Sequence, residues 1–288
     1  MTSLPSLEAN LREIGSSYSG TWTCAVTDLA SGGHIGIDED TVMPAASLIK
    51  VPILVSLYRA VQEGRIRLDD RIALADEHRF PGSGVLQHMA SGVQMSVRDA
   101  AVIMIIISDN TATNMIADLV GRDYINETQR AMGLEKTTVY ERWSERLVGL
   151  DVRKTWVSTA REMAVLLERV ARHEAVSPEA SEDMLRIMRR QDYRHELSRL
   201  LPWTEMNRLP HHKQNWVAEK GGASPGGIRC GGSVFHGSRG SFVMAVFSEG
   251  GRGVGGTGRE SEGNVLLGDL GSAAWRALAA GDDVLANA

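Results

Sequence analysis

Ser47-Leu48-Ile49-Lys50 places a hydroxyl and an amine three residues apart. On a helix, residues at this spacing lie on one face within reach of each other. Serine alone is a poor nucleophile, but a lysine whose ammonium is destabilised by burial or by another cation can take its proton at neutral pH. With 24 serines and five lysines, a Ser-x-x-Lys arises by chance in about a third of chains of this composition, so other motifs must support it.

Two further polar motifs follow along the chain. Ser108-Asp109-Asn110 comes after an apolar run, where three polar side chains without partners would be costly to bury. A helix end followed by an N-cap explains an Asp or an Asn there, but not the whole triplet. Glu219-Lys220-Gly221-Gly222 ends a strand-like segment. In this order and at these separations, the three motifs resemble the Ser-x-x-Lys, Ser-Asp-Asn and Lys-Thr-Gly set of class A β-lactamases and penicillin-binding proteins. Gly221 departs from that set, because the family has Thr or Ser at its position.

The resemblance implies a catalytic role for each matching residue. Ser47 is the implied nucleophile and Lys50 its base. Ser108 is implied to help pass a proton toward the leaving group, and Lys220 to act with it on the proton and the charge during the reaction. The backbone N–H groups of Ser47 and Ala223 are implied to stabilise the oxyanion.

The resemblance also implies substrate-binding residues. Asn110 is implied to bond both Lys50 and a substrate amide, and Gly222 and Ala223 to line the site. Arg229 falls where many class A enzymes keep an arginine that meets a substrate carboxylate. The alternative interpretation, in which Arg229 is merely exposed on the surface of a strand, explains it about as well.

One stretch departs from the family in a way that bears on turnover. Residues 139–147, with Arg142 and Trp143, resemble the start of the family's Ω-loop, where the Arg-Trp pair is followed directly by the glutamate that activates the deacylating water. Here the residue after Trp143 is Ser144, and Glu145 comes one position later. We therefore expect slow hydrolysis of β-lactam adducts, unless a shifted loop lets Glu145 act in the second step.

Composition narrows the classes of partner. At 288 residues with 43% hydrophobic residues, the chain can bury a sizeable core. Its net charge of −5 argues against nucleic acid as a partner. His211 and His212 have no Cys or carboxylate at ligand spacing, so no metal site is expected. The family resemblance implies no organic cofactor. A cluster of arginines interleaved with Asp183, Asp192 and Glu196 favours a solvated face; its members are Arg186, Arg189, Arg190, Arg194 and Arg199.

Compartment and redox state follow from weaker signals. Residues 1–20 carry no basic start or apolar run, and no later stretch approaches the roughly 18 apolar residues of a membrane span, so a cytoplasmic protein is expected. Cys24 and Cys230 both lie in strand-like segments and could approach each other in a sheet. Two buried free thiols are the favoured state in a reducing compartment.

The order of elements predicts an α+β fold. An amphipathic helix over 4–14 and a hairpin over 20–37 precede a buried helix over 47–63. Helices then dominate to about residue 190, and strands over 213–220, 228–235 and 241–247 precede a last helix over 262–280. This order matches an antiparallel sheet built from both chain ends and flanked by terminal helices, with a helical part inserted, which is the serine β-lactamase/transpeptidase fold. We expect one domain, in which 1–42 with 200–288 form the α/β part and 43–199 the helical part.

These observations favour a serine hydrolase resembling class A β-lactamases, which acts through a Ser47 acyl-enzyme on a lactam, amide or ester carbonyl. Lys220 and Arg229 together favour a small anionic substrate. An active β-lactamase is the close alternative. A ligand-binding or sensor protein that has lost turnover is the distant one, for which Gly221 and Ser144 speak.

Overall fold

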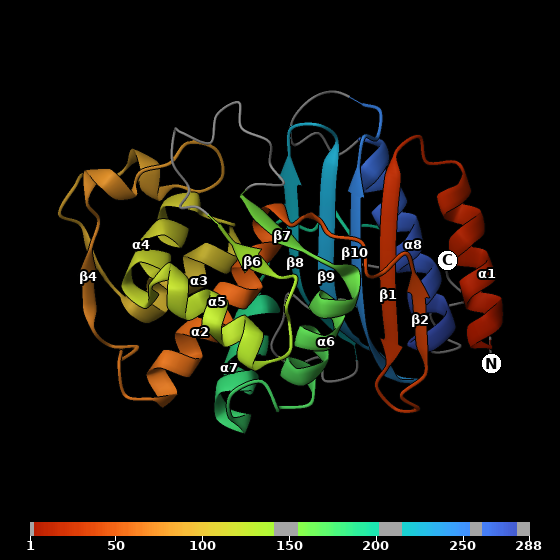
Figure 1. Cartoon of the computed structure of the whole chain (residues 1–288), viewed down its shortest axis with the longest axis horizontal. Helices are drawn as coiled ribbons and strands as arrows, with labels where there is room; N and C mark the ends of the chain where they lie inside the picture. Colours follow the sequence, from red (N-terminus) through yellow and green to blue (C-terminus); the bar gives the residue numbers. More distant parts are fainter. Residues whose placement is uncertain (1–2, 141–154, 202–214, 254–260, 281–288) are drawn as a thin grey trace.

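An antiparallel sheet joins the two ends of the chain in a computed structural model, which describes residues 3–140, 155–201, 215–253 and 261–280. Within these ranges the sheet has five strands in the order β2-β1-β10-β9-β8 (Figure 1). The hairpin register pairs Cys24 with Ile37 and Ala25 with Gly36. The strands are β1 (Thr21–Asp28), β2 (His34–Ile37), β8 (Trp216–Ser224), β9 (Ile228–His236) and β10 (Ser241–Glu249).

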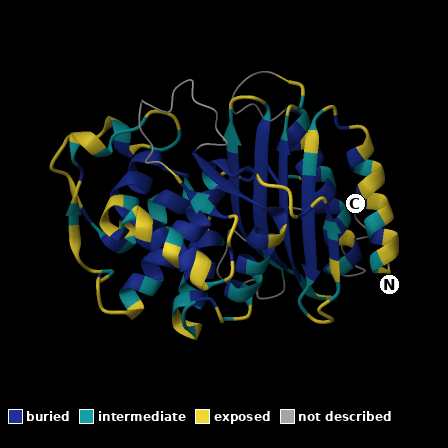
Figure 2. Ribbon diagram, in the orientation of Figure 1, coloured by how far each residue is buried: buried dark blue, intermediate teal, exposed yellow. Residues whose placement is uncertain are grey.

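Helices cover both faces of this sheet. The terminal helices α1 (Leu4–Ser16) and α8 (Glu262–Leu278) lie together on one face, and α6 (Ala160–Ala171) packs against strands on the other. The inner strands are therefore buried along almost their whole length (Figure 2). Two apolar clusters result, because the side chains of a strand alternate between its two faces.

The middle of the chain forms the helical cluster beside the sheet in Figure 1. Its helices begin at polar caps: the Ser96 hydroxyl accepts from the Asp99 N–H, and Thr159 and Ser177 cap their helices in the same way. The helices are α2 (Lys50–Gln62), α3 (Val97–Ile106), α4 (Asn110–Val120), α5 (Arg122–Ala131) and α7 (Pro178–Met188), with short helices η1 (Ala46–Ile49), η2 (Asp76–His78) and η3 (Leu86–His88). The short strands are β3 (Met43–Pro44), β4 (Arg71–Ala73), β5 (Gln94–Ser96), β6 (Thr138–Val139) and β7 (Trp156–Ser158).

The predicted fold class is therefore confirmed, with the sheet drawn from both chain ends and helices between them. The residue limits proposed for its two parts stay a prediction. None of the helices in the described ranges is long and apolar enough to span a bilayer.

The segment that carries Ser47 differs from the single helix expected over 47–63. Ser47 lies in the 3₁₀ helix η1, and the α-helix begins only at Lys50. Ala46, just before the serine, has a φ of +39°, in the left-handed region that an L-residue enters at a cost of about 1–2 kcal/mol. Hydrophobic spacing does not separate a 3₁₀ turn from an α-turn over four residues, so the sequence could not reveal this change.

The two cysteines are free and buried, as the sequence predicted. Cys24 belongs to the apolar cluster under α1 and α8, whereas Cys230 belongs to the cluster on the opposite face of the sheet. The Cys230 thiol points toward the carbonyl oxygen of Ala45, at an Sγ–O distance of 3.0 Å. A bridge between the two thiols would have to pass through the sheet.

Candidate active site

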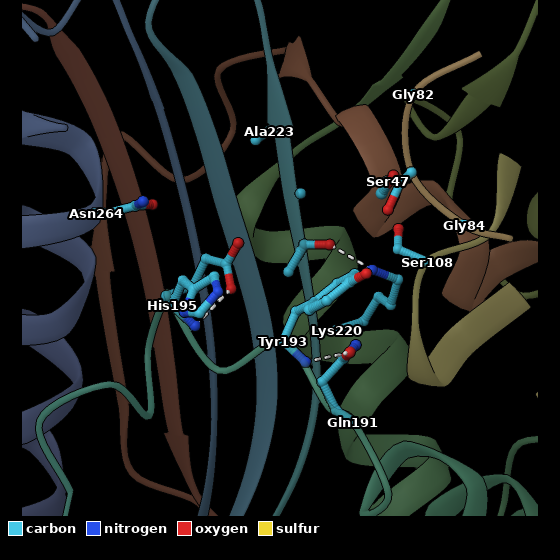
Figure 3. A pocket seen from close by; sticks show the side chains of 14 residues that line it. Ser47, Gly82, Gly84, Ser108, Gln191, Tyr193, His195, Lys220, Ala223 and Asn264 are labelled. Carbon is cyan, nitrogen blue, oxygen red and sulfur yellow. Dashed lines mark hydrogen bonds between the residues drawn. The ribbon is translucent and has the colours of Figure 1, made fainter. Parts of the chain in front are cut away.

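A cavity of about 570 Å³ lies between the helical cluster and the edge strand β8. In Figure 3, Ser47 and Ser108 lie on one side of it and point toward each other, and His195 and Asn264 lie on the other. The described residues that line it are Ser47, Gly82, Ser83, Gly84, Ser108, Gln191, Tyr193, His195, Glu196, Lys220, Gly221, Gly222, Ala223 and Asn264. The structure thus brings Ser47, Ser108 and Lys220 from three distant segments to one cavity.

Lys50 lies behind this cavity, fully buried at the start of α2. Its Nζ lies 2.6 Å from Ser108 O, 2.9 Å from Asn110 Oδ1 and 3.0 Å from Ser108 Oγ. Burial lowers the pKa of Lys50 well below its usual value, and the positive charge of Lys220 lowers it further, while Asp109 acts in the opposite direction. Its surroundings therefore favour the neutral amine more than water does.

Hydrogen-bond accounting assigns a direction to these contacts. The carbonyl oxygens of Ser108 and Asn110 can only accept, so the lysine donates to both. It also donates to the Ser108 Oγ at 3.0 Å, which keeps this hydroxyl next to the amine.

The Ser108-Asp109-Asn110 segment links α3 to α4 through a strained residue. Ser108 has a φ of +56°, a conformation that costs an L-residue energy and that clusters at functional sites. Asp109 caps α4, because its side chain accepts from the Ala112 N–H at 2.9 Å. The same carboxylate accepts from the N–H groups of Val85 and Leu86 at 2.6 and 2.9 Å, and so fixes the 82–84 wall of the cavity. The N-cap explanation is thus correct for Asp109, and the other two residues serve Lys50.

Asn110 contributes through Lys50 rather than through the cavity wall. Its Oδ1 accepts from Lys50, and its Nδ2 donates to Pro81 O at 3.1 Å. It is not among the described residues that line the cavity. Its contact with a substrate amide stays a prediction.

Strand β8 approaches Ser47 closely because it carries Gly222 there. A Cβ on Gly222 would lie 2.8 Å from Ser47 N and 3.0 Å from Leu48 N, so a larger residue would force the strand away. Ser47 lies in the first turn of η1, where backbone N–H groups lack carbonyl partners within the helix. Ala223 follows on the outermost described strand, so both groups predicted to bind an oxyanion lie at the cavity wall.

Lys220 is the second buried lysine of the site. Its ammonium donates to Gly221 O at 2.6 Å. Burial lowers its pKa to about 8, while the carboxylates of Glu196 and Glu219 and the sulfur of Cys230 act in the opposite direction. Its positive charge is, after burial, a second cause that lowers the pKa of Lys50.

The prediction of a solvated face for the arginine-rich segment is wrong for two of its members. Arg194 and Glu196 are each only 9% exposed. Arg194 donates to Arg189 O at 2.9 Å and pairs with Glu219 at 3.4 Å, while Glu196 lines the cavity. Alternating charges are typical of a solvated helix face, and this pattern concealed the fact that the loop after α7 folds back over β8. Gly221 was the one signal in the sequence, because a missing side chain leaves space for another group.

Arg229 is buried, so the alternative of an exposed strand arginine is wrong. It is 2% exposed, donates to Ile228 O at 2.6 Å, and packs on Gly263 of α8, where a Cβ would approach its Cγ to 2.8 Å. It is not among the described residues that line the cavity. Its predicted contact with a substrate carboxylate stays a prediction.

Two further predictions concern the residues of the deacylation step and the absence of a metal. Ser144 and Glu145 lie outside the described residues. In the described ranges, no group of three or more His, Cys, Asp or Glu side chains is placed to hold a metal ion.

Comparisons with known proteins agree with this geometry. The model of the family described as Beta-lactamase enzyme family matches residues 6–278. The Beta-lactamase regulatory protein BlaB of Streptomyces cacaoi is 26% identical over 140 residues, or 48% of this chain and 45% of that protein. Beta-lactamase L2 of Stenotrophomonas maltophilia is 31% identical over 102 residues, or 35% of this chain and 33% of that protein. The matched segments span less than half the length of these curated relatives.

Solved structures extend the similarity over almost the whole chain. A β-lactamase from Sphaerobacter thermophilus has a TM-score of 0.82 at 26% identity, covering 96% of this chain and 97% of that one. A variant of PBP-A in an acyl-enzyme complex with penicillin G has a TM-score of 0.80 at 28% identity, covering 95% of this chain and 96% of that one.

Proposed function

Because the chain belongs to the Beta-lactamase enzyme family, we propose that it is a serine hydrolase that forms an acyl-enzyme at Ser47 with a lactam, amide or ester carbonyl. The observation that carries the proposal is the buried Lys50, whose pKa is lowered and whose amine is held by Ser108 and Asn110 behind the cavity that Ser47 lines. Burying an amine without a packing purpose costs stability, so a role in proton transfer is the better explanation.

In the acylation step, the Ser47 hydroxyl attacks the carbonyl carbon and its proton passes to the lone pair of Lys50. The resulting ammonium is disfavoured by its surroundings and passes a proton to the Ser108 hydroxyl, 3.0 Å away. Ser108 in turn protonates the leaving nitrogen or oxygen. The negative charge that develops on the carbonyl oxygen is taken up by the backbone N–H groups of Ser47 and Ala223.

Deacylation is proposed to be slow for β-lactam adducts. It needs a base that activates water, and Ser144 cannot serve as one near pH 7. Loss of a general base typically slows a reaction by roughly a hundred- to ten-thousand-fold. Small acyl groups from simple esters leave more room for water, so esters are the better candidates for turnover.

A second candidate function is a protein that is acylated or occupied by a β-lactam and signals this state. The observation in its favour is the similarity to a regulatory protein over part of the chain. The two candidates differ in turnover and share the Ser47 adduct.

Time-resolved intact-mass analysis separates them. The protein is incubated with benzylpenicillin and, separately, with a nitrophenyl ester whose hydrolysis is followed in steady state, with Ser47→Ala as the blank. We expect a penicilloyl adduct on wild type that persists for minutes, together with continuing ester turnover. An adduct without turnover of any ester would favour the sensor, and no adduct with any acylating probe would refute the proposed chemistry.

A further inference from the structure

The space beside Gly221 is occupied by a carboxylate. A Cβ on Gly221 would lie 2.3 Å from both the carboxyl carbon and Oε2 of Glu196, and 2.6 Å from its Oε1. These distances are shorter than real Cβ contacts, so a side chain at position 221 would force the carboxylate of Glu196 to move. The hydroxyl side chain expected at position 221 is absent, and a carboxylate stands in its place.

This carboxylate keeps acceptor capacity toward the cavity. Glu196 lines the cavity and accepts one long hydrogen bond, from the His195 N–H at 3.3 Å, among the contacts of the described residues. A carboxylate offers about four acceptor positions. The ammonium of Lys220 is turned to Gly221 O, and no ion pair within 4.0 Å joins it to Glu196 in the described part of the chain. A ligand that enters here meets acceptor oxygens.

A carboxylate opposes the positive charge of Lys220 at this end of the cavity. Burial, and after it the negative charge of Glu219, raise the pKa of Glu196 to about 7, while Lys220 and Arg229 act in the opposite direction. Glu219 itself is paired with Arg194, at 3.4 Å, and is bonded to the Ser198 hydroxyl at 2.6 Å. Glu196 is thus the carboxylate left to offset Lys220 where a substrate would lie.

We propose that Glu196 is a specificity-determining residue, whose carboxylate makes the Lys220 end of the cavity select acyl substrates bearing a hydrogen-bond donor, an ammonium above all, over substrates bearing a carboxylate. The sequence favoured an anionic substrate because Lys220 and Arg229 were the charged groups assigned to the site. Glu196 changes that balance, because like charges at close range in a partly dry cavity repel strongly. The inference rests on the proposed acyl-enzyme chemistry at Ser47.

Three nitrophenyl esters of one acyl skeleton test it, ending in a primary amine, a methyl ester or a carboxylate. In wild type, kcat/KM is expected to fall in that order, and more steeply as the pH rises through the Glu196 pKa of about 7. In Glu196→Gln, the ratio for the carboxylate ester over the neutral ester is expected to rise by about ten-fold or more, since the repelling charge is gone. Glu219→Gln is the matched control, because it removes a buried carboxylate near Lys220 that is not among the described lining residues, and its ratio is expected to move far less.

A double-mutant cycle tests the fit of Glu196 to Gly221 separately. Gly221→Thr alone collides with the carboxylate and is expected to lower the melting temperature, whereas Gly221→Thr with Glu196→Ala is expected to recover it and to favour the carboxylate ester.

Each outcome bears on one claim. A wild type that prefers the carboxylate ester, or a ratio unchanged in Glu196→Gln, would overturn the inference while the neutral ester still acylates Ser47. Equal shifts in Glu196→Gln and Glu219→Gln would assign the effect to distant charge and overturn direct selection. Failure of every ester to acylate Ser47 would instead refute the proposed function.

Discussion

Lys50 and Ser108 are joined twice: the lysine Nζ lies 2.6 Å from the serine main-chain oxygen and 3.0 Å from its hydroxyl. The first contact requires the unusual backbone of Ser108, whose φ of +56° turns its carbonyl toward the buried amine. The position of Lys50, the base proposed for acylation, is thus linked to the strained backbone of Ser108.

Replacement of Ser108 can separate strain from chemistry. Ser108→Ala keeps the left-handed penalty of about 1–2 kcal/mol, while Ser108→Gly removes it but adds about 0.5–1 kcal/mol of chain entropy on folding. We expect Ser108→Gly to be more stable than Ser108→Ala by about 1 kcal/mol in urea denaturation, with both acylating Ser47 slowly. Without strain only the entropy cost would remain, so a Ser108→Ala variant more stable than Ser108→Gly by about 0.5–1 kcal/mol would show that the turn stores none.

The charge on Lys220 should appear in the pH dependence of acylation. Since the pKa of Lys50 is lowered, its neutral form is present above that pKa, and acylation is lost as the pH falls through it. In Lys220→Met a charge that disfavours the Lys50 ammonium is gone, so the pKa of Lys50 rises and the acid limb moves to higher pH. Burial remains the larger cause, so the shift is partial.

Single-turnover acylation by a neutral ester measures this limb, because the ester makes no charged contact with Lys220. The position of the limb, not the maximal rate, is the readout. An acid limb that stays in place in Lys220→Met would mean that Lys220 does not influence Lys50.

Introduction of the missing base should accelerate deacylation. Ser144→Glu is expected to shorten the lifetime of a penicilloyl adduct on Ser47 by roughly a hundred-fold or more, the usual contribution of a general base. Intact mass after rapid removal of free penicillin follows the adduct. Glu145→Ala is the companion variant: rapid penicillin turnover in wild type that disappears in this variant would assign the base to Glu145, and rapid turnover that survives it would contradict slow deacylation.

The cysteines should be inert in the folded protein. Burial raises the pKa of Cys230 to about 12 and raises that of Cys24 as well, so neither thiolate forms near neutral pH. A thiol reagent is expected to label neither cysteine in the native protein and both in denaturant. An oxidant should not join them, because they face opposite sides of the sheet. Rapid native labelling, or a Cys24 to Cys230 bridge in folded protein, would contradict this arrangement.

Sequence reasoning identified residues that converge on the cavity where it could use local pattern, and failed where the fold alone decides proximity. Ser47, Lys50, Ser108 and Lys220 could be predicted because each stands in a short motif whose order matches a family. Glu196 could not, since its neighbours in sequence are alternating charges and only the return of the chain over β8 brings it to Gly221.

The sequence also did not reveal backbone conformation or the direction in which a side chain points. Residue type does not reveal that Ser108 adopts a positive φ, because serine rarely does so outside tertiary constraint. Arg229 likewise matched a family position, but its direction depends on how α8 packs against β9.

The approach of Gly222 to the Ser47 N–H has a consequence for the newly made chain. Ser47 is synthesised before β8, the strand whose Gly222 lies beside it. Until β8 is made, the oxyanion site proposed at Ser47 and Ala223 is incomplete, so we expect the nascent chain not to be acylated at Ser47. An acylating probe in cells is therefore expected to label folded molecules and not chains still being synthesised.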